Sequence, residues 1–310
     1  MKRSRTWLVA LALLLTPALL VAQDTAPGPD QIVIAEAGLM PEGIAWDPVH
    51  ETFLVGSLSQ GNVHRVADDG TLTQLSDSDN LRVSVGLEVD AERNRVLAVG
   101  SGANQNGAAL GAYDLETGEE LFYVDLAPLA ADSERHFGND VAVDDDGNAY
   151  VTDSAAGVIY RVDVDGEAEV FLFDSSFLGQ FVLNGIAFNP NGYLIAVRSP
   201  DLMKIPLDDP QAFTIVQAGG DVSSGDGITF VDPTTLVLVS GRRQVVQHIE
   251  SHDDFISATV TAEFEPQPIS ATTAAVRGDD VYVVHARFSD PTAAEYPIDR
   301  VTFTEIEAQG

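Results

Sequence analysis

The sequence predicts an all-β protein: a six-bladed β-propeller with four-stranded blades, its ring closed by an N-terminal strand. One phrase of alternating small and apolar residues recurs along the chain. Each copy is followed by further short apolar segments separated by Gly, Asp and Asn. Strict alternation with such punctuation is typical of β-strands, and no window has the ~3.6-residue period of a long helix.

The recurring phrase sets the number of blades. Its copies begin at Pro41, Ser84, Gly138, Leu183, Gly225 and Ala271 and read PEGIAWD, SVGLEVD, GNDVAVD, LNGIAFN, GDGITFV and ATTAAVR. The second residues of successive copies are separated by 43, 54, 45, 42 and 46 residues. A four-stranded sheet repeated every ~40–50 residues is the unit of a propeller, because one such sheet cannot bury both of its faces alone. Five or seven blades are the alternatives.

Each repeat supplies its strands in the same order. The phrase is the first strand, a turn and a second apolar segment follow, and segments such as NVHRV from Asn62 and EVFLF from Glu169 are the third and fourth strands. The last repeat has only its phrase, VYVVHAR from Val281 and DRVTFTEI from Asp299. The segment QIVIAEA from Gln31 belongs to no repeat. We therefore expect it to complete the sixth blade and close the ring.

The first residues have the pattern of a secretory signal peptide. Three basic residues precede an apolar run from Trp7 to Leu15, and no acidic residue occurs before Asp24. The run is shorter than the ~18 residues that a membrane span needs. We expect residues 1–22 to be cleaved, leaving residues 23–310 as a single propeller domain in the periplasm or outside the cell. An uncleaved anchor is the alternative.

The composition excludes several classes of function. The chain has 48 acidic and 16 basic residues, a net charge of −32, which repels nucleic-acid phosphates and anionic membranes. It has no cysteine, which rules out disulfides, thiolate metal sites and cysteine nucleophiles. GxSxG, HExxH, P-loop and dinucleotide motifs are missing from the sequence. A small-molecule partner remains, and the oligomeric state stays open.

The second residues of the six phrases predict a metal site. The first strand of each propeller blade lines the central channel, so these residues form a ring at one end of it. The four that carry carboxylate or amide oxygens are Glu42, Asn139, Asn184 and Asp226, whereas Val85 and Thr272 offer no such group. This donor set, without His or Cys, suits calcium best. Magnesium, manganese and zinc are alternative ions.

Local turns are the competing interpretation. Asn184–Gly185 and Asp226–Gly227 are ordinary turn dipeptides. However, Glu42 is not a turn residue and Asn139 is followed by Asp140, yet both stand in the same register as the other two.

The segments PEGIAWD, GNDVAVDDDGNAYVTDS, LNGIAF and GDGITF resemble the ligand-bearing segments of the senescence-marker-protein, gluconolactonase and regucalcin family. The resemblance runs from about Gly38 to the C-terminus. It implies a six-bladed propeller with calcium-dependent hydrolysis, typically of lactones. By position, Glu42, Asn184 and Asp226 match the family's metal ligands. Asn139 matches an asparagine near metal and substrate, and Asp226 matches the carboxylate that activates water.

One departure from the family concerns the substrate. The sugar lactonases have an arginine two residues before this asparagine, and Phe137 stands there instead, preceded by Arg135 and His136. We expect these three residues and Asn139 to contact a substrate that is less polar than a sugar acid lactone. Metal coordination lowers the basicity of a carboxylate, so His136 is the alternative to Asp226 as the catalytic base.

The sequence leaves three functions to compare. The first is a calcium-dependent hydrolase of lactones or related esters. The second is a non-catalytic propeller that binds a ligand or protein and keeps the cation for structure. The third is a metal-dependent hydrolase of phosphotriesters.

Overall fold

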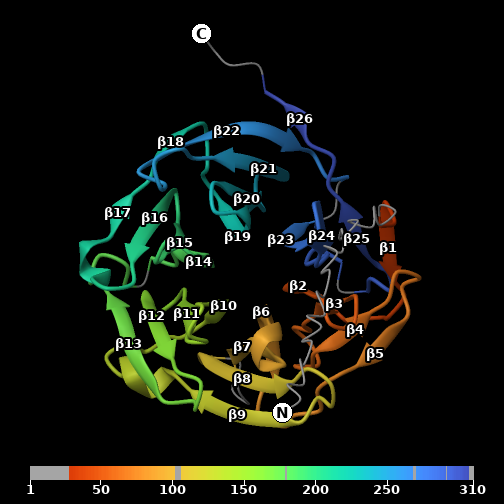
Figure 1. Ribbon diagram of the computed structural model, residues 1–310. Helices are drawn as coiled ribbons and strands as arrows, with labels where there is room; N and C mark the ends of the chain where they lie inside the picture. The colour runs from red at the N-terminus through yellow and green to blue at the C-terminus, as the bar shows by residue number, and fades with distance from the viewer. Residues whose placement is uncertain (1–27, 102–105, 179, 268–269, 291, 307–310) are drawn as a thin grey trace, which may run out of the picture.

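The computed structural model describes residues 28–101, 106–178, 180–267, 270–290 and 292–306. Six antiparallel sheets surround a central axis, with the first strand of each blade innermost (Figure 1). The prediction of a six-bladed propeller with four-stranded blades is therefore confirmed. The predicted signal peptide, residues 1–22, lies outside the described residues. Among the residues described, the structure has no helix with the length and apolar character to cross a membrane.

The first three blades follow the chain in order. Blade one contains β2 (Ile44–Asp47), β3 (Thr52–Val55), β4 (His64–Val66) and β5 (Leu72–Gln74). Blade two contains β6 (Val83–Asp90), β7 (Arg95–Ser101), β8 (Ala109–Asp114) and β9 (Glu120–Asp125). Blade three contains β10 (Gly138–Val143), β11 (Ala149–Asp153), β12 (Val158–Val162) and β13 (Ala168–Phe173). Short 3-10 turns occur at Ala91–Arg93, Ala127–Ala130 and, in blade four, Pro210–Ala212.

The last three blades include the additions at the chain ends. Blade four contains β14 (Leu183–Asn189), β15 (Tyr193–Arg198), β16 (Asp201–Pro206) and β17 (Thr214–Ile215). Blade five contains β19 (Gly225–Asp232), β20 (Thr235–Ser240), β21 (Val245–Glu250) and β22 (Ser257–Phe264), extended by β18 (Gln217–Gly219) and β26 (Thr304–Glu305). Blade six contains β23 (Ala271–Arg277), β24 (Asp280–His285), β25 (Tyr296–Arg300) and β1 (Gln31–Ile34).

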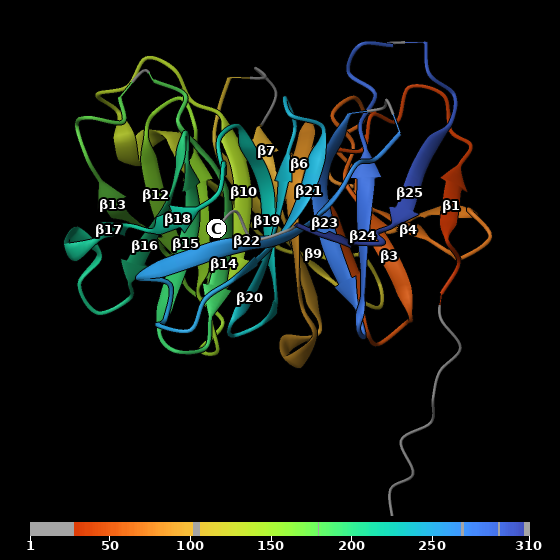
Figure 2. The ribbon, with the colours of Figure 1, turned by 90° about the horizontal axis from the view of Figure 1, so that it is seen from above.

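The N-terminal strand closes the ring, as the sequence predicts. β1 pairs antiparallel with β25, with Gln31 opposite Asp299 and Ile34 opposite Tyr296, and the two strands lie side by side in Figure 2. Alternate residues Ile32 and Ile34 are buried in the core between blades six and one. The sixth blade is therefore built from both ends of the chain.

The C-terminal segment differs from the prediction of one continuous strand from Asp299. β25 ends at Arg300, and β26 leaves blade six to pair antiparallel with β22 of blade five (Figure 1). The intervening Val301 and Phe303 pack against the core between blades five and six. Burial of these apolar side chains favours the crossing, which a strand pattern alone does not reveal.

Apolar clusters fill the seams between neighbouring blades. In the described part of the chain there are six clusters, each made of residues from two adjacent blades. At the seam that closes the ring, Phe53 of blade one meets Tyr282 of blade six with ring centroids 4.9 Å apart. Each sheet therefore buries both faces only because it has two neighbours.

A β-bulge recurs in the inner strands at the position of the predicted ring. The register shifts between Ser84 and Leu87, Gly138 and Val141, Leu183 and Ile186, Gly225 and Ile228, and Ala271 and Thr273. An extra residue at a bulge bends the strand and re-aims its side chains. The phrase thus encodes a bulged strand, and Asn184–Gly185 and Asp226–Gly227 lie inside β14 and β19 instead of in turns.

Gly227→Ala is expected to lower the free energy of unfolding by about 1–3 kcal/mol. A Cβ at Gly227 would lie 1.9 Å from Thr273 Oγ1 and 2.7 Å from the Thr273 Cα of the next inner strand, so backbone has to move. Gly219→Ala is the matched control, because its nearest contact would be 3.3 Å and it also lies in a strand of blade five. Denaturant unfolding of both variants checks this, and equal stabilities would show that the inner strands are not packed to contact here.

Candidate active site

Two of the predicted ring residues are in direct contact. Asn184 of blade four donates a hydrogen bond from Nδ2 to Oδ1 of Asp226 in blade five, at 2.9 Å. Thr152 Oγ1 donates to the Asn184 carbonyl at 2.8 Å and so fixes the backbone that carries the amide. Burial raises the pKa of Asp226 to about 6, and the hydrogen bond from Asn184 opposes that rise.

Glu42 lies close to this pair across the channel. Its side chain is buried, and Thr272 Oγ1 donates to its backbone carbonyl at 2.6 Å. Burial and the negative charges of Asp226 and Asp140 raise the pKa of Glu42 well above its usual value. The carboxylates of three different blades therefore repel one another in a site with little water.

Asp140 is a member of the site that the sequence reasoning missed. It is buried beside Asn139, and its Oδ2 accepts a hydrogen bond from the backbone N–H of Ile186 at 3.1 Å. Burial raises the pKa of Asp140 to about 7. The signal was present in the phrase, because an aspartate stands here where most copies have glycine.

The donor set suits a hard divalent cation. Buried carboxylates are stable in proteins when they are paired or coordinate a metal. Among the residues that the structure describes, no basic side chain forms an ion pair with Glu42, Asp140 or Asp226. Within the described ranges, however, no three acidic or histidine side chains form a group that could hold a metal by themselves. A cation bound by Glu42 and Asp226 would therefore need further oxygen ligands, for which the sequence predicts the amides of Asn139 and Asn184.

A cavity of about 510 Å³ opens over Asn184 and Asp226. It is built from the connections of blades four, five and six, and Thr272 also lines it. Phe181 and Phe288 contribute aromatic rings to its wall. Glu42 and Asn139 do not line this cavity and are buried.

The residues before Asn139 take different directions. The ring of Phe137 contacts that of Phe181, with centroids 5.8 Å apart, and the guanidinium of Arg135 lies 5.8 Å from the same Phe181 ring. His136 instead donates a hydrogen bond from Nδ1 to Oδ2 of the fully buried Asp153, at 2.8 Å. Arg135 and Phe137 are thus joined to the cavity wall, whereas His136 anchors its loop to β11.

A second cavity, of about 220 Å³, lies within the channel and is lined by Glu88 and Asp140. Burial, followed by the charges of Asp140 and Asp90, raises the pKa of Glu88 to about 8. When a carboxyl has a higher pKa in the folded protein than in the unfolded chain, its proton stabilises the fold. This contribution to the free energy of unfolding is lost as the pH rises from the unfolded pKa to the folded pKa.

Glu88→Gln is therefore expected to raise the free energy of unfolding at pH 8–9 by about 1–2 kcal/mol and to leave it nearly unchanged near pH 4. Unfolding curves across this range measure the effect. The exposed Glu92→Gln of the same blade is the control and should change little at either pH. A Glu88→Gln variant that is less stable than the parent at pH 9 would contradict the prediction.

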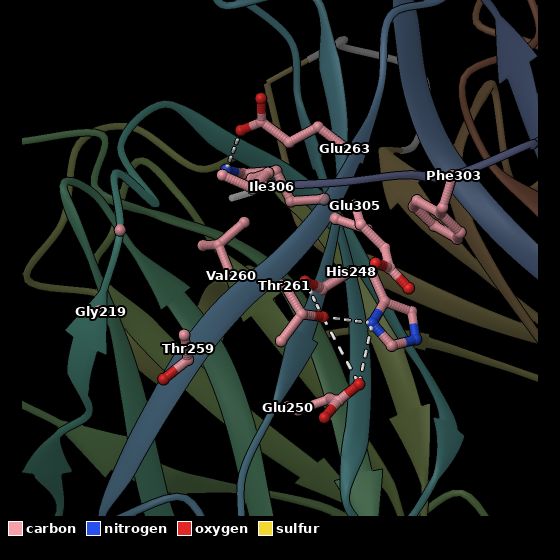
Figure 3. A pocket seen from close by; sticks show the side chains of 13 residues that line it. Gly219, His248, Glu250, Thr259, Val260, Thr261, Glu263, Phe303, Glu305 and Ile306 are labelled. Carbon is pink, nitrogen blue, oxygen red and sulfur yellow. Dashed lines mark hydrogen bonds and ion pairs between the residues drawn. The ribbon is translucent and has the colours of Figure 1, made fainter. Parts of the chain in front are cut away.

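A larger cavity lies away from these residues. It measures about 920 Å³ and lies on the outer edge of blade five, between β18, β22 and β26 (Figure 3). Its polar side chains bond one another: His248 Nδ1 lies 2.8 Å from Thr261 Oγ1 and 3.6 Å from Glu250 Oε1. None of the predicted ring residues lines it.

The comparisons with known proteins decide the family. Residues 40–264 match the family model described as the SMP-30/gluconolactonase/LRE-like region. The chain belongs to this family. A search of curated proteins found no match. The matched range contains all four predicted ligand residues.

Solved structures share the fold. The major allergen Mala s 1 of Malassezia sympodialis aligns with a TM-score of 0.74 and 21% identity over 88% of this chain and 96% of its own. A calcium-binding regucalcin from Agrobacterium tumefaciens aligns with a TM-score of 0.64 and 18% identity over 89% and 95%. A gluconolactonase from Xanthomonas campestris aligns with a TM-score of 0.60 and 19% identity over 86% and 88%. At these identities the likeness shows the propeller fold alone and leaves the activity and the substrate open.

Proposed function

We propose that the protein is a divalent-metal-dependent hydrolase of lactones or related esters, with calcium as its ion. The observation that carries the proposal is the proximity of two carboxylates from separate blades: the buried Glu42, and Asp226, which lines a cavity of about 510 Å³. Family membership agrees with it. Periplasmic or extracellular location and a small-molecule partner are part of the same proposal.

Glu42 and Asp226, with the amide oxygens of Asn139 and Asn184, would hold the ion. When bound, it would polarise the carbonyl of the substrate and stabilise the charge that develops on its oxygen. Asn184 orients the Asp226 carboxylate through the 2.9 Å hydrogen bond. The aromatic wall limits access of bulk water to the cavity floor.

The reaction needs one water and no other co-reactant. The water oxygen forms a bond to the carbonyl carbon, the ring C–O bond breaks, and the product is a hydroxy acid. Asp226 accepts the proton of the attacking water and passes it to the departing alkoxide, which leaves the carboxylate ready for the next water. A pKa of about 6 in the metal-free site leaves Asp226 mostly ionised at neutral pH, as a base requires.

A panel of lactones, aryl esters and phosphotriesters, assayed with calcium and with EDTA, tests the proposal. We expect lactone turnover with calcium and its loss in EDTA, restored by adding calcium back. Preference for a phosphotriester over every lactone would instead favour the third function. Calcium binding without turnover of any substrate would favour a non-catalytic propeller with a structural cation.

A further inference from the structure

The wall of the channel-mouth cavity is aromatic. Phe181 and Phe288 line it and are 50% and 46% exposed, so both rings present apolar surface at the cavity. Phe181 has a φ of 54°, a left-handed conformation that is uncommon for a bulky residue. Phe288 follows Arg287, which bonds to the Glu295 carbonyl at 2.9 Å and to Asp290 at 3.1 Å. Fixed local structure thus holds both rings out at the cavity.

Two arginines at the same rim have no carboxylate partner. Ten of the twelve arginines in the described residues form ion pairs, as expected in a chain with 48 acidic residues. The two exceptions are Arg135 and Arg242. Arg135 lies over the ring of Phe181, and Arg242 lines the cavity itself. Both unpaired guanidinium groups are therefore at one site.

Arg242 is close to the proposed reacting groups. The preceding Gly241 approaches Asp226 so closely that a Cβ there would lie 3.1 Å from its Oδ2. The guanidinium is exposed and has no hydrogen bond within the described part of the chain, so no protein group competes for it. A guanidinium pairs with a carboxylate or phosphate through two parallel hydrogen bonds.

We infer that this cavity takes substrates with an oxyanion (a carboxylate or a phosphate) next to an apolar or aromatic body. The inference rests on the proposed function only for the bond that is cleaved. The binding preference is argued independently, from the aromatic wall and from Arg135 and Arg242. The aromatic body packs against Phe181 and Phe288, and the anionic group pairs with Arg242, with Arg135 adding positive potential. A neutral polyhydroxylated lactone would gain little from the aromatic wall and has no anionic group to pair with Arg242.

Binding of three probes tests the preference without any turnover. Calorimetric titration of 3-phenylpropionate, phenyl phosphate and neutral 3-phenylpropanamide should show that at least one anion binds more tightly than the amide. Arg242→Gln should weaken anion binding roughly tenfold and leave amide binding unchanged. Arg242→Lys should retain part of the affinity. The control Arg82→Gln removes another half-exposed arginine, paired with Asp79, and should match the parent.

Turnover separates this inference from the proposed function. The substrates are phthalide and phthalide-5-carboxylate, which share a ring and differ in charge. We expect a lower KM for the carboxylate in the parent and loss of that advantage in Arg242→Gln, whereas the control Arg82→Gln should keep the KM values of the parent for both lactones. If both lactones are hydrolysed equally well by parent and variant, the inference is wrong and the proposed function stands. If neither is hydrolysed but anion binding depends on Arg242, the proposed function fails and the inference stands. Equal affinity for the anions and the amide overturns the inference in either case.

Discussion

Asp226→Asn is expected to lower kcat for lactone hydrolysis by about 10²–10⁴-fold while the propeller stays folded. The amide is nearly the same size as the carboxylate but cannot accept a proton from water. In the parent, Asn184 Nδ2 donates a hydrogen bond to Oδ1 of Asp226, and the amide oxygen of the variant can still accept this bond. The substitution also removes the charge repulsion between Asp226 and Glu42 in the metal-free site. The melting temperature without calcium should therefore be unchanged or higher.

Asp232→Asn is the matched control. Asp232 ends the same strand, β19, but is exposed and accepts hydrogen bonds from Thr234 in the turn that follows it. Its loss removes the same charge from the opposite end of the strand, so activity should stay within about twofold of the parent. Full activity in Asp226→Asn would exclude this carboxylate as the base and direct attention to His136, whose Nε2 could accept a proton while Nδ1 stays bonded to Asp153.

The sequence was sufficient to predict the fold because each sequence repeat corresponds to one structural unit, a blade. Each copy of the phrase makes one inner strand, bulged in five of the six blades, and six copies require six blades. The spare segment at Gln31 had to pair with something, and only the sixth blade lacked a strand. The contact of Asn184 with Asp226 follows from the shared register, because equivalent positions in adjacent blades meet near the axis.

Other features depend on contacts between segments with no common pattern. The C-terminal segment reads as one strand, but burial of Val301 and Phe303 carries it to blade five. Asp140 lies one residue past the ring position, so an alignment on the second residue passes over it. The lack of partners for Arg242 is a property of the folded surface, and no local pattern encodes it.

The roles of the ring residues remain predictions, and calcium binding is their most direct test. Calcium at a hundredfold excess over its Kd should raise the free energy of unfolding by about 2.7 kcal/mol. For a domain of this size that corresponds to a rise in Tm of roughly 5–10 °C. Glu42→Gln should remove most of this rise, because it deletes one of only two ring carboxylates. The exposed Glu119→Gln should keep all of it.

The pH dependence of this shift distinguishes a ring site from calcium bound loosely to an acidic surface. Burial raises the pKa of both Glu42 and Asp226, the latter to about 6, so protons compete with the ion in the site. The calcium-induced rise in Tm should therefore be small at pH 5 and grow through pH 6 to 8 in the parent. Ordinary surface carboxylates are already ionised at pH 5 and would give a rise that hardly changes over this range. A rise that is independent of pH and unaffected by Glu42→Gln would place the ion outside the channel mouth.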